Sequence, residues 1–166
     1  MDHLCPAPDA AQFRSVLSHY PTGVCAITTT DGAGSPLVMI VGSFSAVSLN
    51  PPLVGFLPAK TSTTWPGLRQ RGHFCVNVLS ADQGAQCLQM SSRTGDRFAG
   101  LGWRASASGD PILDGVVAWI DCTLHAVSDA GDHDFVLGHV RGMAVESGKA
   151  PLIFHRGGLT SAEISK

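Results

Sequence analysis

Apolar positions at helical spacing define the first element of the chain. They recur at i, i+3, i+4 and i+7, the spacing of one helix face, and the residues are Phe13, Val16, Leu17 and Tyr20. Asp9 is a favoured N-cap residue just before them, and Pro21 interrupts the pattern after them. The pattern therefore predicts a helix that begins after Asp9 and ends near Tyr20.

Short apolar or alternating runs, separated by turns rich in glycine and proline, predict strands along most of the remaining chain. The runs cover 24–30, 37–41, 43–49, 53–57, 73–79, 116–127, 135–145 and 152–154. Trp65-Pro66 favours the start of a second helix, and Ser80 with Gln83 resembles a capping box for a third. The glycine-rich stretch 91–111 is interpreted as a long connection.

The sum is about seven short strands and three helices in one domain, since no repeat or linker divides the chain. Strands that follow one another through short turns favour antiparallel pairing. The expected class is therefore mainly β, a barrel with flanking helices. No strand is followed by G-x-G-x-x-G, so a Rossmann domain is not supported.

Composition narrows the classes of function. Of the 166 residues 44% are hydrophobic and 14% are charged, which excludes a disordered tail or a coiled coil. The formal net charge of −2 argues against nucleic acid as a partner. The chain has no apolar run long enough to span a bilayer and no signal-peptide pattern, so we expect a cytoplasmic protein without a membrane partner. The low charged fraction suggests that part of the surface is buried against another subunit.

Five cysteines are widely spaced and form no C-x-x-C motif, which indicates neither a disulfide framework nor a zinc site. Cys25, Cys75 and Cys122 lie within apolar runs. We interpret these three as small buried hydrophobic residues rather than as reactive thiols. No metal site is expected.

The chain also lacks G-x-S-x-G, H-E-x-x-H, a Walker A lysine motif and any cluster of carboxylates. A short chain without such groups suggests that a bound cofactor carries the chemistry. The loop 58–64 offers hydroxyls, one lysine and backbone N–H groups before a helix, which is what a phosphate needs. An ordinary helix cap is the alternative.

Three further features each have a functional and a structural interpretation. Alternation places Ser43, Ser45 and Val47 on one face of a strand. This face either lines a ligand groove or is the solvent-exposed face of an edge strand. His133 lies in a turn, where a histidine is ordinarily just solvated. The segment 154–158 closes the last strand with an aromatic residue and a cation, for an anionic ligand or as a surface pair.

Taken together and in order, these blocks resemble the flavin reductase-like family, FMN-binding split barrels that act as reductase components of two-component flavin monooxygenases. The resemblance runs from Phe13 to Gly158. It is carried by FRSVLSHYPTGVCAITT, SFSAVSLNPPLV, the loop from Lys60 to Thr64, GHFCVNVLS, DRFAG, the GDH at 131–133 and PLIFHRG at 151–157. It places the domain at residues 9–158, with flexible termini at 1–8 and 159–166.

The resemblance implies a Greek-key barrel that forms a homodimer, holds FMN or FAD at the subunit interface and reduces it with NADH or NADPH. The reduced flavin would then pass to a flavin-dependent monooxygenase. Carried onto this sequence, the flavin ring lies along Leu37, Val38, Met39, Ile40, Val41, Gly42 and Ser43. Its ribityl and phosphate groups meet Lys60, Ser62, Thr63 and Thr64, with help from Ser45, Asn77 and Arg97. The nicotinamide approaches near His133, Phe154, His155, Arg156 and Gly157.

Direct hydride transfer needs ring stacking and exclusion of water, so the resemblance makes His133 a catalytic residue that positions the nicotinamide. Two positions depart from the family pattern. Ile40 replaces a small hydroxyl residue, and Gly42 replaces an amide, which should open space beside the ring. These departures keep two alternatives open: a flavin- or ligand-binding barrel without turnover, and a barrel adapted to a non-redox biosynthetic step such as a cyclisation.

Overall fold

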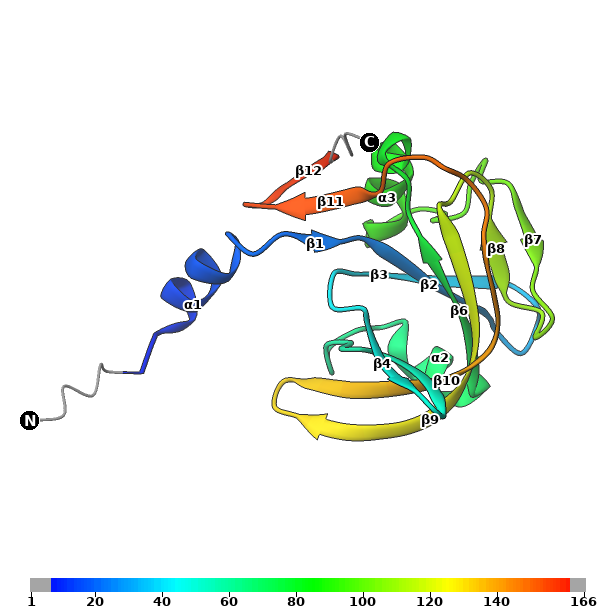
Figure 1. Cartoon of the computed structure of the whole chain (residues 1–166), viewed down its shortest axis with the longest axis horizontal. Helices are drawn as coiled ribbons and strands as arrows, with labels where there is room; N and C mark the ends of the chain where they lie inside the picture. The colour runs from blue at the N-terminus through cyan, green and yellow to red at the C-terminus, as the bar shows by residue number, and fades with distance from the viewer. Residues whose placement is uncertain (1–6, 162–166) are drawn as a thin grey trace, which may run out of the picture.

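A seven-stranded antiparallel sheet forms the largest part of the protein, whose computed structural model describes residues 7–161. The sheet is strongly curved around a central core (Figure 1). Its two outer strands, β3 and β4, are not hydrogen-bonded to each other, so the barrel is split rather than closed. In sheet order, the strands are β3 (Pro36–Val41), β2 (Cys25–Thr30), β6 (His73–Val78), β9 (Ala118–Ala130), β10 (His133–Val145), β5 (Pro52–Phe56) and β4 (Ser45–Leu49).

Two smaller sheets and two helices lie against the barrel, and a third helix extends from one end of it (Figure 1). One sheet contains β1 (Thr22–Gly23), β11 (Leu152–His155) and β12 (Gly158–Ser161), and the other contains β7 (Trp103–Ala105) and β8 (Pro111–Leu113). The helices are α1 (Ala10–Leu17), α2 (Trp65–Arg71), the 3-10 turn η1 (Ala81–Gln83) and α3 (Gly84–Ser91). The prediction of a mainly β barrel with flanking helices is confirmed.

Local signals located all three helices, although α1 ends at Leu17 and not near Tyr20. Asp9 caps α1 by accepting a hydrogen bond from the Gln12 amide at 2.7 Å. The Ser80 amide donates to Gln83 Oε1 at 3.0 Å, as a capping box requires, but this box opens the short η1 turn that precedes α3.

Short strands were the main omission of the sequence prediction. The connection expected at 91–111 contains β7 and leads directly into β8. The strand β12 continues to Ser161, so residues 159–161 pair with β11 and do not form a flexible terminus. The expectations for residues 1–6 and 162–166 lie outside the described residues. Strands of two to four residues carry too little periodicity to be recognised.

Two apolar clusters share β2, which is buried on both faces. Cys25 and Ile27 face the barrel interior with Phe56 and Phe74, while Ala26 faces a second cluster beneath α3. The interpretation of Cys25, Cys75 and Cys122 as buried hydrophobic residues is confirmed, because all three are buried. Burial raises the pKa of the Cys25 and Cys122 thiols to about 12, so these thiols stay protonated.

Helix α1 stands apart from this core. Figure 1 shows it extending from one end of the barrel, and none of its residues is buried. The predicted apolar face is present, yet Phe13 is 55% exposed and Tyr20, just after the helix, is 72% exposed. No helix among residues 7–161 is long and apolar enough to cross a membrane.

Candidate functional site

A cavity of about 530 Å³ opens between β3, the loop after β5 and the end of α3. Its lining combines apolar side chains from β3 and α3 with hydroxyls from the loop and two arginines. The lining residues are Met39, Ile40, Ala59, Thr61, Ser62, Thr63, Thr64, Met90, Ser91, Arg93 and Arg97. The structure therefore brings together six of the predicted site residues, namely Met39, Ile40, Ser62, Thr63, Thr64 and Arg97.

The hydroxyl-rich loop is shaped by its own side chains. Ser62 Oγ accepts hydrogen bonds from the Thr64 and Trp65 amides, each at 3.3 Å, so this hydroxyl also caps α2. The Thr61 and Thr63 side chains form no hydrogen bond to another residue within 7–161, and both are exposed. The loop thus supports both earlier interpretations, because one hydroxyl serves the helix and two face the cavity mouth.

The two arginines of the cavity differ in their partners. Arg97 donates from Nη1 to the Val38 carbonyl at 3.2 Å and to Thr64 Oγ1 at 3.1 Å, so it braces β3 against the loop. Arg93 has no hydrogen-bond or ion-pair partner within the described part of the chain, and it lines the same cavity. Sequence reasoning missed Arg93, since a single cation in a long connection gives no local signal.

A second, more apolar cavity of about 410 Å³ adjoins the first and shares Ile40 and Ser91 with it. It brings Phe154 and Gly157, two residues of the predicted nicotinamide segment, beside Gly42. The remaining lining residues are Val24, Cys87, Leu88 and Leu159. Two adjoining cavities with a common wall at Ile40 are an arrangement that can hold two flat rings next to each other.

The surroundings of Gly42 correct one expectation. A Cβ atom at this position would lie 2.7 Å from Thr22 Oγ1, closer than van der Waals contact allows. The space that the glycine was expected to open is therefore filled on its Cβ side by Thr22. The alternative of a non-redox biosynthetic step relied on that space, and the Cβ side of Gly42 gives it no support.

Lys60 does not line either cavity. Its ammonium group pairs with the Asp129 carboxylate and donates to the Gly131 carbonyl at 2.6 Å, so it points to the β9–β10 turn. The hydrogen bond with Asp129 raises the pKa of Lys60, and the same contact lowers the pKa of Asp129. The ion pair therefore holds Lys60 at this turn, and a contact between Lys60 and a flavin phosphate stays a prediction.

His133 is half-exposed at the first residue of β10 and also lies outside both cavities. Its Nδ1 is 2.7 Å from the Asp132 carboxylate, and its backbone pairs with Ala59 at the start of the hydroxyl loop. The contact with His133 lowers the pKa of Asp132. A catalytic role for His133 stays a prediction, and the structure adds that the turn and the loop are joined.

Asn77 belongs to the core and not to the site. Its side chain is fully buried, and Nδ2 donates to the Pro111 carbonyl at 3.1 Å and to Thr28 Oγ1 at 2.9 Å. Its Oδ1 accepts from the Leu113 amide at 2.8 Å. This amide therefore attaches β8 to the barrel and has no group left for a ligand.

The other predicted residues border the two cavities. Leu37 and Val38 line a smaller cavity that shares Arg97 with the first, and Gly42, Ser43 and Ser45 line a depression beside Tyr20. Ser43 Oγ accepts from the Leu57 amide at 2.9 Å, which makes its hydroxyl structural.

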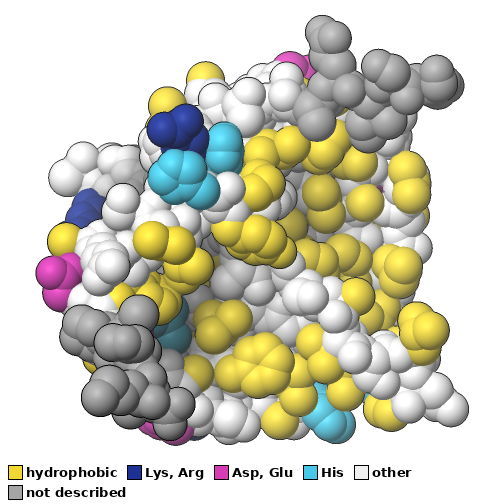
Figure 2. Space-filling model, turned by 60° about the vertical axis from the view of Figure 1, so that its left-hand side comes forward, with side chains coloured by type: hydrophobic (Ala, Val, Ile, Leu, Met, Phe, Trp, Pro, Cys, Tyr) yellow, Lys and Arg dark blue, Asp and Glu magenta, His cyan; other side chains and the backbone are white. Residues whose placement is uncertain are grey.

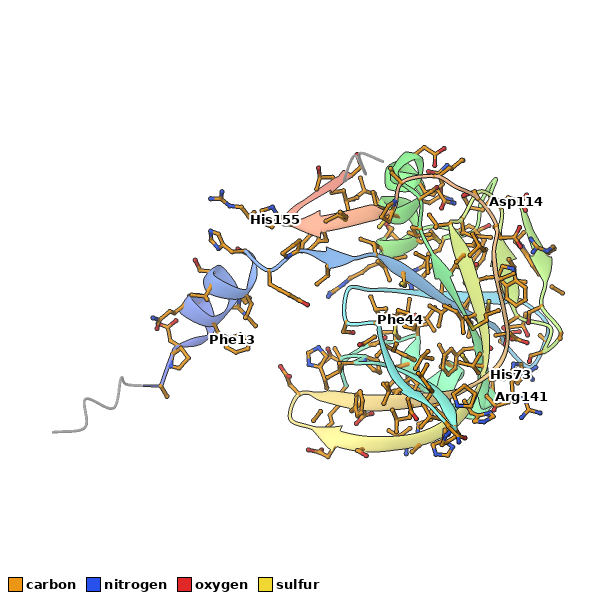
Figure 3. The ribbon with its side chains drawn as sticks, viewed as in Figure 1. Phe13, Phe44, His73, Asp114, Arg141 and His155 are labelled. Atoms are coloured by element: carbon orange, nitrogen blue, oxygen red, sulfur yellow. The ribbon has the colours of Figure 1, made fainter. Side chains whose placement is uncertain are left out.

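Three more of the predicted residues lie away from the two cavities. Val41 is buried in the barrel core. The Arg156 amide donates to the Ser18 carbonyl at 2.8 Å and so joins the β11–β12 turn to the end of α1. His155 is the last residue of β11 and pairs with Gly158, at the end of the molecule that carries α1 (Figure 3).

Comparison with known proteins agrees with this geometry. Residues 17–163 match the family model described as flavin reductase like domain. The chain belongs to the flavin reductase-like family. It is 55% identical over 152 residues to a flavin reductase of Pseudomonas putida, with 92% of this chain and 89% of that protein covered. It is 45% identical to the reductase subunit HsaB of a flavin-dependent monooxygenase from Rhodococcus jostii, over 96% of this chain and 82% of that one.

Solved structures of similar proteins share the fold. Component B of a nitrilotriacetate monooxygenase from Mycobacterium thermoresistibile superposes with a TM-score of 0.89 at 44% identity, covering 92% of this chain and 86% of that one. The NADH:FAD oxidoreductase SgcE6 of Streptomyces globisporus, in complex with NAD and FAD fragments, gives 0.86 at 30% identity, covering 95% and 93%. The predicted split-barrel fold and family membership are confirmed.

Proposed function

We propose that this flavin reductase-like protein is an NAD(P)H:flavin oxidoreductase that supplies reduced FMN or FAD to a partner monooxygenase. The observation that carries the proposal is the pair of adjoining cavities with Ile40 as their common wall, one polar at its mouth and one apolar. The names of the relatives support the same activity and the same kind of partner. When both are bound, NAD(P)H and flavin supply the redox chemistry, a two-electron hydride transfer from nicotinamide C4 to flavin N5.

The first cavity fits the polar tail of a flavin. The Thr61 and Thr63 hydroxyls and the Arg93 guanidinium line it, and none of them has a partner among residues 7–161. Hydrogen bonds to a charged group are worth about 1.5–3 kcal/mol each, so these groups would hold a phosphate strongly. Arg97 keeps the loop and β3 at a fixed separation by bonding to both.

The apolar wall between the cavities fits the rings. Met39, Ile40 and Met90 offer flat apolar contact in the first cavity, and Phe154 with Leu159 offers it in the second. Such surfaces exclude water from the space between two stacked rings, which a hydride transfer requires.

Measuring NAD(P)H consumption with added FMN and then FAD, against a protein-free control, tests this function. Turnover well above the control supports it and ranks the flavins and the nicotinamide donors. A folded protein without turnover contradicts it. In His133→Ala, we expect slower turnover with retained flavin binding, and unchanged turnover would contradict a positioning role for His133.

We also propose that the active form is a homodimer. The exposed apolar face of α1 has no contact within residues 7–161 that buries it. Figure 2 shows apolar side chains gathered around a hollow on the side of the molecule that carries α1. Apolar surface of this extent marks an interface, and a second copy of the chain would cover it.

Charged substitutions on the two sides of α1 separate this interface from a general effect of charge. Phe13→Glu with Leu17→Glu places two carboxylates on the apolar face, and we expect light scattering to show a monomer. Ala11→Glu with Ser15→Glu adds the same charge to the opposite side of the helix and should leave the dimer intact. A monomeric wild-type protein at micromolar concentration would contradict the proposal.

A further inference from the structure

The hairpin formed by β9 and β10 has two β-bulges, and each of them displaces a basic residue. His125 is the extra residue of β9, because Leu137 and Gly138 pair with Ala126 and Leu124. Arg141 is the extra residue of β10, between the rungs of Val140 and Gly142. Bulges re-aim side chains and recur beside functional surfaces, so two bulges with basic residues form a specific feature of this hairpin.

The displaced residues share the outer face of the barrel with two histidines. His73, Thr123 and His139 occupy one rung across β6, β9 and β10. Their neighbours Phe74 and Cys122 belong to the interior cluster, so the rung itself faces outward. The rings of His125 and His139 are 6.4 Å apart. Arg71 adjoins the same rung, since the Leu124 amide donates to the Gly72 carbonyl at 2.8 Å.

We call this surface the basic face and define it by Arg71, His73, His125, His139 and Arg141. Arg71 and Arg141 are exposed and have no carboxylate within 4 Å among the residues from 7 to 161. The carboxylate that contacts this face is the fully buried Asp110, which lies 2.7 Å from His73 Nδ1. Exposed cations without counter-charges, in a chain whose net charge is −2, offer complementarity to an acidic partner.

The basic face is separate from the apolar side and close to the flavin cavity. Figure 3 places His73 and Arg141 at the end of the molecule opposite Phe13 and α1. A second copy covering α1 would therefore leave this face open. The seven-residue helix α2 leads from the cavity at Thr64 to Arg71, a length of about 10 Å at 1.5 Å per residue. A partner held here would lie within reach of flavin leaving the cavity.

We propose that the basic face is the docking surface for an acidic patch on the oxygenase component that receives reduced flavin. This inference rests on the proposed reductase function. Electrostatic docking of this kind raises the rate of encounter and weakens with salt. It keeps reductase and oxygenase together only briefly, which suits the transfer of a reactive reduced flavin.

The test uses the full-length chain and the purified oxygenase subunit of the Rhodococcus jostii monooxygenase whose reductase subunit is HsaB. Arg71→Glu with Arg141→Glu reverses the two permanent charges of the face. The control reverses two cations elsewhere, Arg104→Glu with Lys149→Glu, which pair with Glu146 and Asp82. Binding is measured by calorimetry at low and high NaCl concentration, and oxygenase product formation is measured at limiting flavin.

We expect salt-sensitive binding of the wild-type chain and of the control, and at least about a tenfold weaker Kd for the double reversal on the basic face. The single variant Arg141→Glu, which leaves α2 intact, should weaken binding in the same direction. No salt-sensitive binding by wild type, or equal losses in the control, would overturn the docking surface. NADH oxidation with free FMN and no oxygenase tests the reductase function separately, and it should be unchanged in all variants.

Discussion

Two regions of this protein gather polar side chains, and they differ in whether those groups have partners. Around β7 and β8, the side chains of Thr28, Asn77, Asp110 and Asp121 are buried and hydrogen-bonded. Thr28 and Asn77 bond to each other and to backbone carbonyls, Asp110 accepts from Thr29 and contacts His73, and Asp121 accepts from Ser106 and Ser108. Around the first cavity, Thr61, Thr63 and Arg93 have no internal partner among the described residues. Both regions contain threonine hydroxyls, and only in the second are the hydroxyls available to a ligand.

The difference shows why a polar residue beside a predicted site need not belong to it. A buried polar group must be satisfied, and Asn77 achieves this within the protein by bonding to β2 and β8. A ligand-binding group instead forms its hydrogen bonds with water until the ligand binds.

Removing the amide of Asn77 should cause a large loss of stability. Asn77→Ala leaves the buried Leu113 amide unpaired, and we expect the free energy of unfolding to fall by about 3 kcal/mol. Urea unfolding measures this. The flavin Kd of the folded variant should equal that of wild type, so weaker flavin binding at unchanged stability would place Asn77 in the site after all.

Removing the guanidinium of Arg93 should weaken flavin binding and leave the stability of the protein nearly unchanged. In Arg93→Ala, we expect FMN to bind about 10- to 100-fold more weakly, from the loss of charge-assisted bonds, with nearly unchanged stability. Fluorescence titration with FMN, and with riboflavin as the ligand without phosphate, measures this.

A matched control exists in the neighbouring loop. Lys60→Ala removes the same charge, but Lys60 is held at the β9–β10 turn, so FMN affinity should change less than about threefold. An equal loss in both variants would show that net charge matters and that the direction of the Arg93 side chain does not.

Adding a side chain at position 42 tests whether there is unoccupied space beside Gly42. Gly42→Ala places a Cβ 2.7 Å from Thr22 Oγ1, and we expect a loss of about 1–2 kcal/mol in the free energy of unfolding. Thr22→Ala removes that hydroxyl, so the double variant should recover most of the loss. Thermal unfolding of the three variants checks this, and a harmless Gly42→Ala would restore the idea of open space.

The buried carboxyl of Asp110 should also make the stability of the protein depend on pH. Burial raises the pKa of Asp110, although His73 opposes the shift. A raised carboxyl pKa contributes stability below the unfolded value, and this contribution is lost as pH rises through the folded value. Asp110→Asn should therefore remove a small decline in stability just above pH ~4, measured by urea unfolding across pH. An unchanged pH profile would contradict this assignment.

Local sequence patterns were enough to predict the helices, the longer strands and the family. Helical spacing after Asp9, alternation at 73–79 and the ordered blocks from Phe13 to Gly158 are local, and each predicted what the structure shows. The hydroxyl loop was also recognisable, because a phosphate site and a helix cap both need hydroxyls beside free N–H groups.

Which polar groups lack a partner within residues 7–161 depends on long-range contacts that local patterns do not show. Lys60 pairs with Asp129, 69 positions away, and Asn77 bonds to Leu113, 36 positions away, so neither partner is visible locally. Arg93 enters the cavity and Thr22 fills the space beside Gly42 for the same reason. Residue type sets what a side chain can bond to, whereas folding brings distant partners together and thereby decides which bonds remain for a ligand.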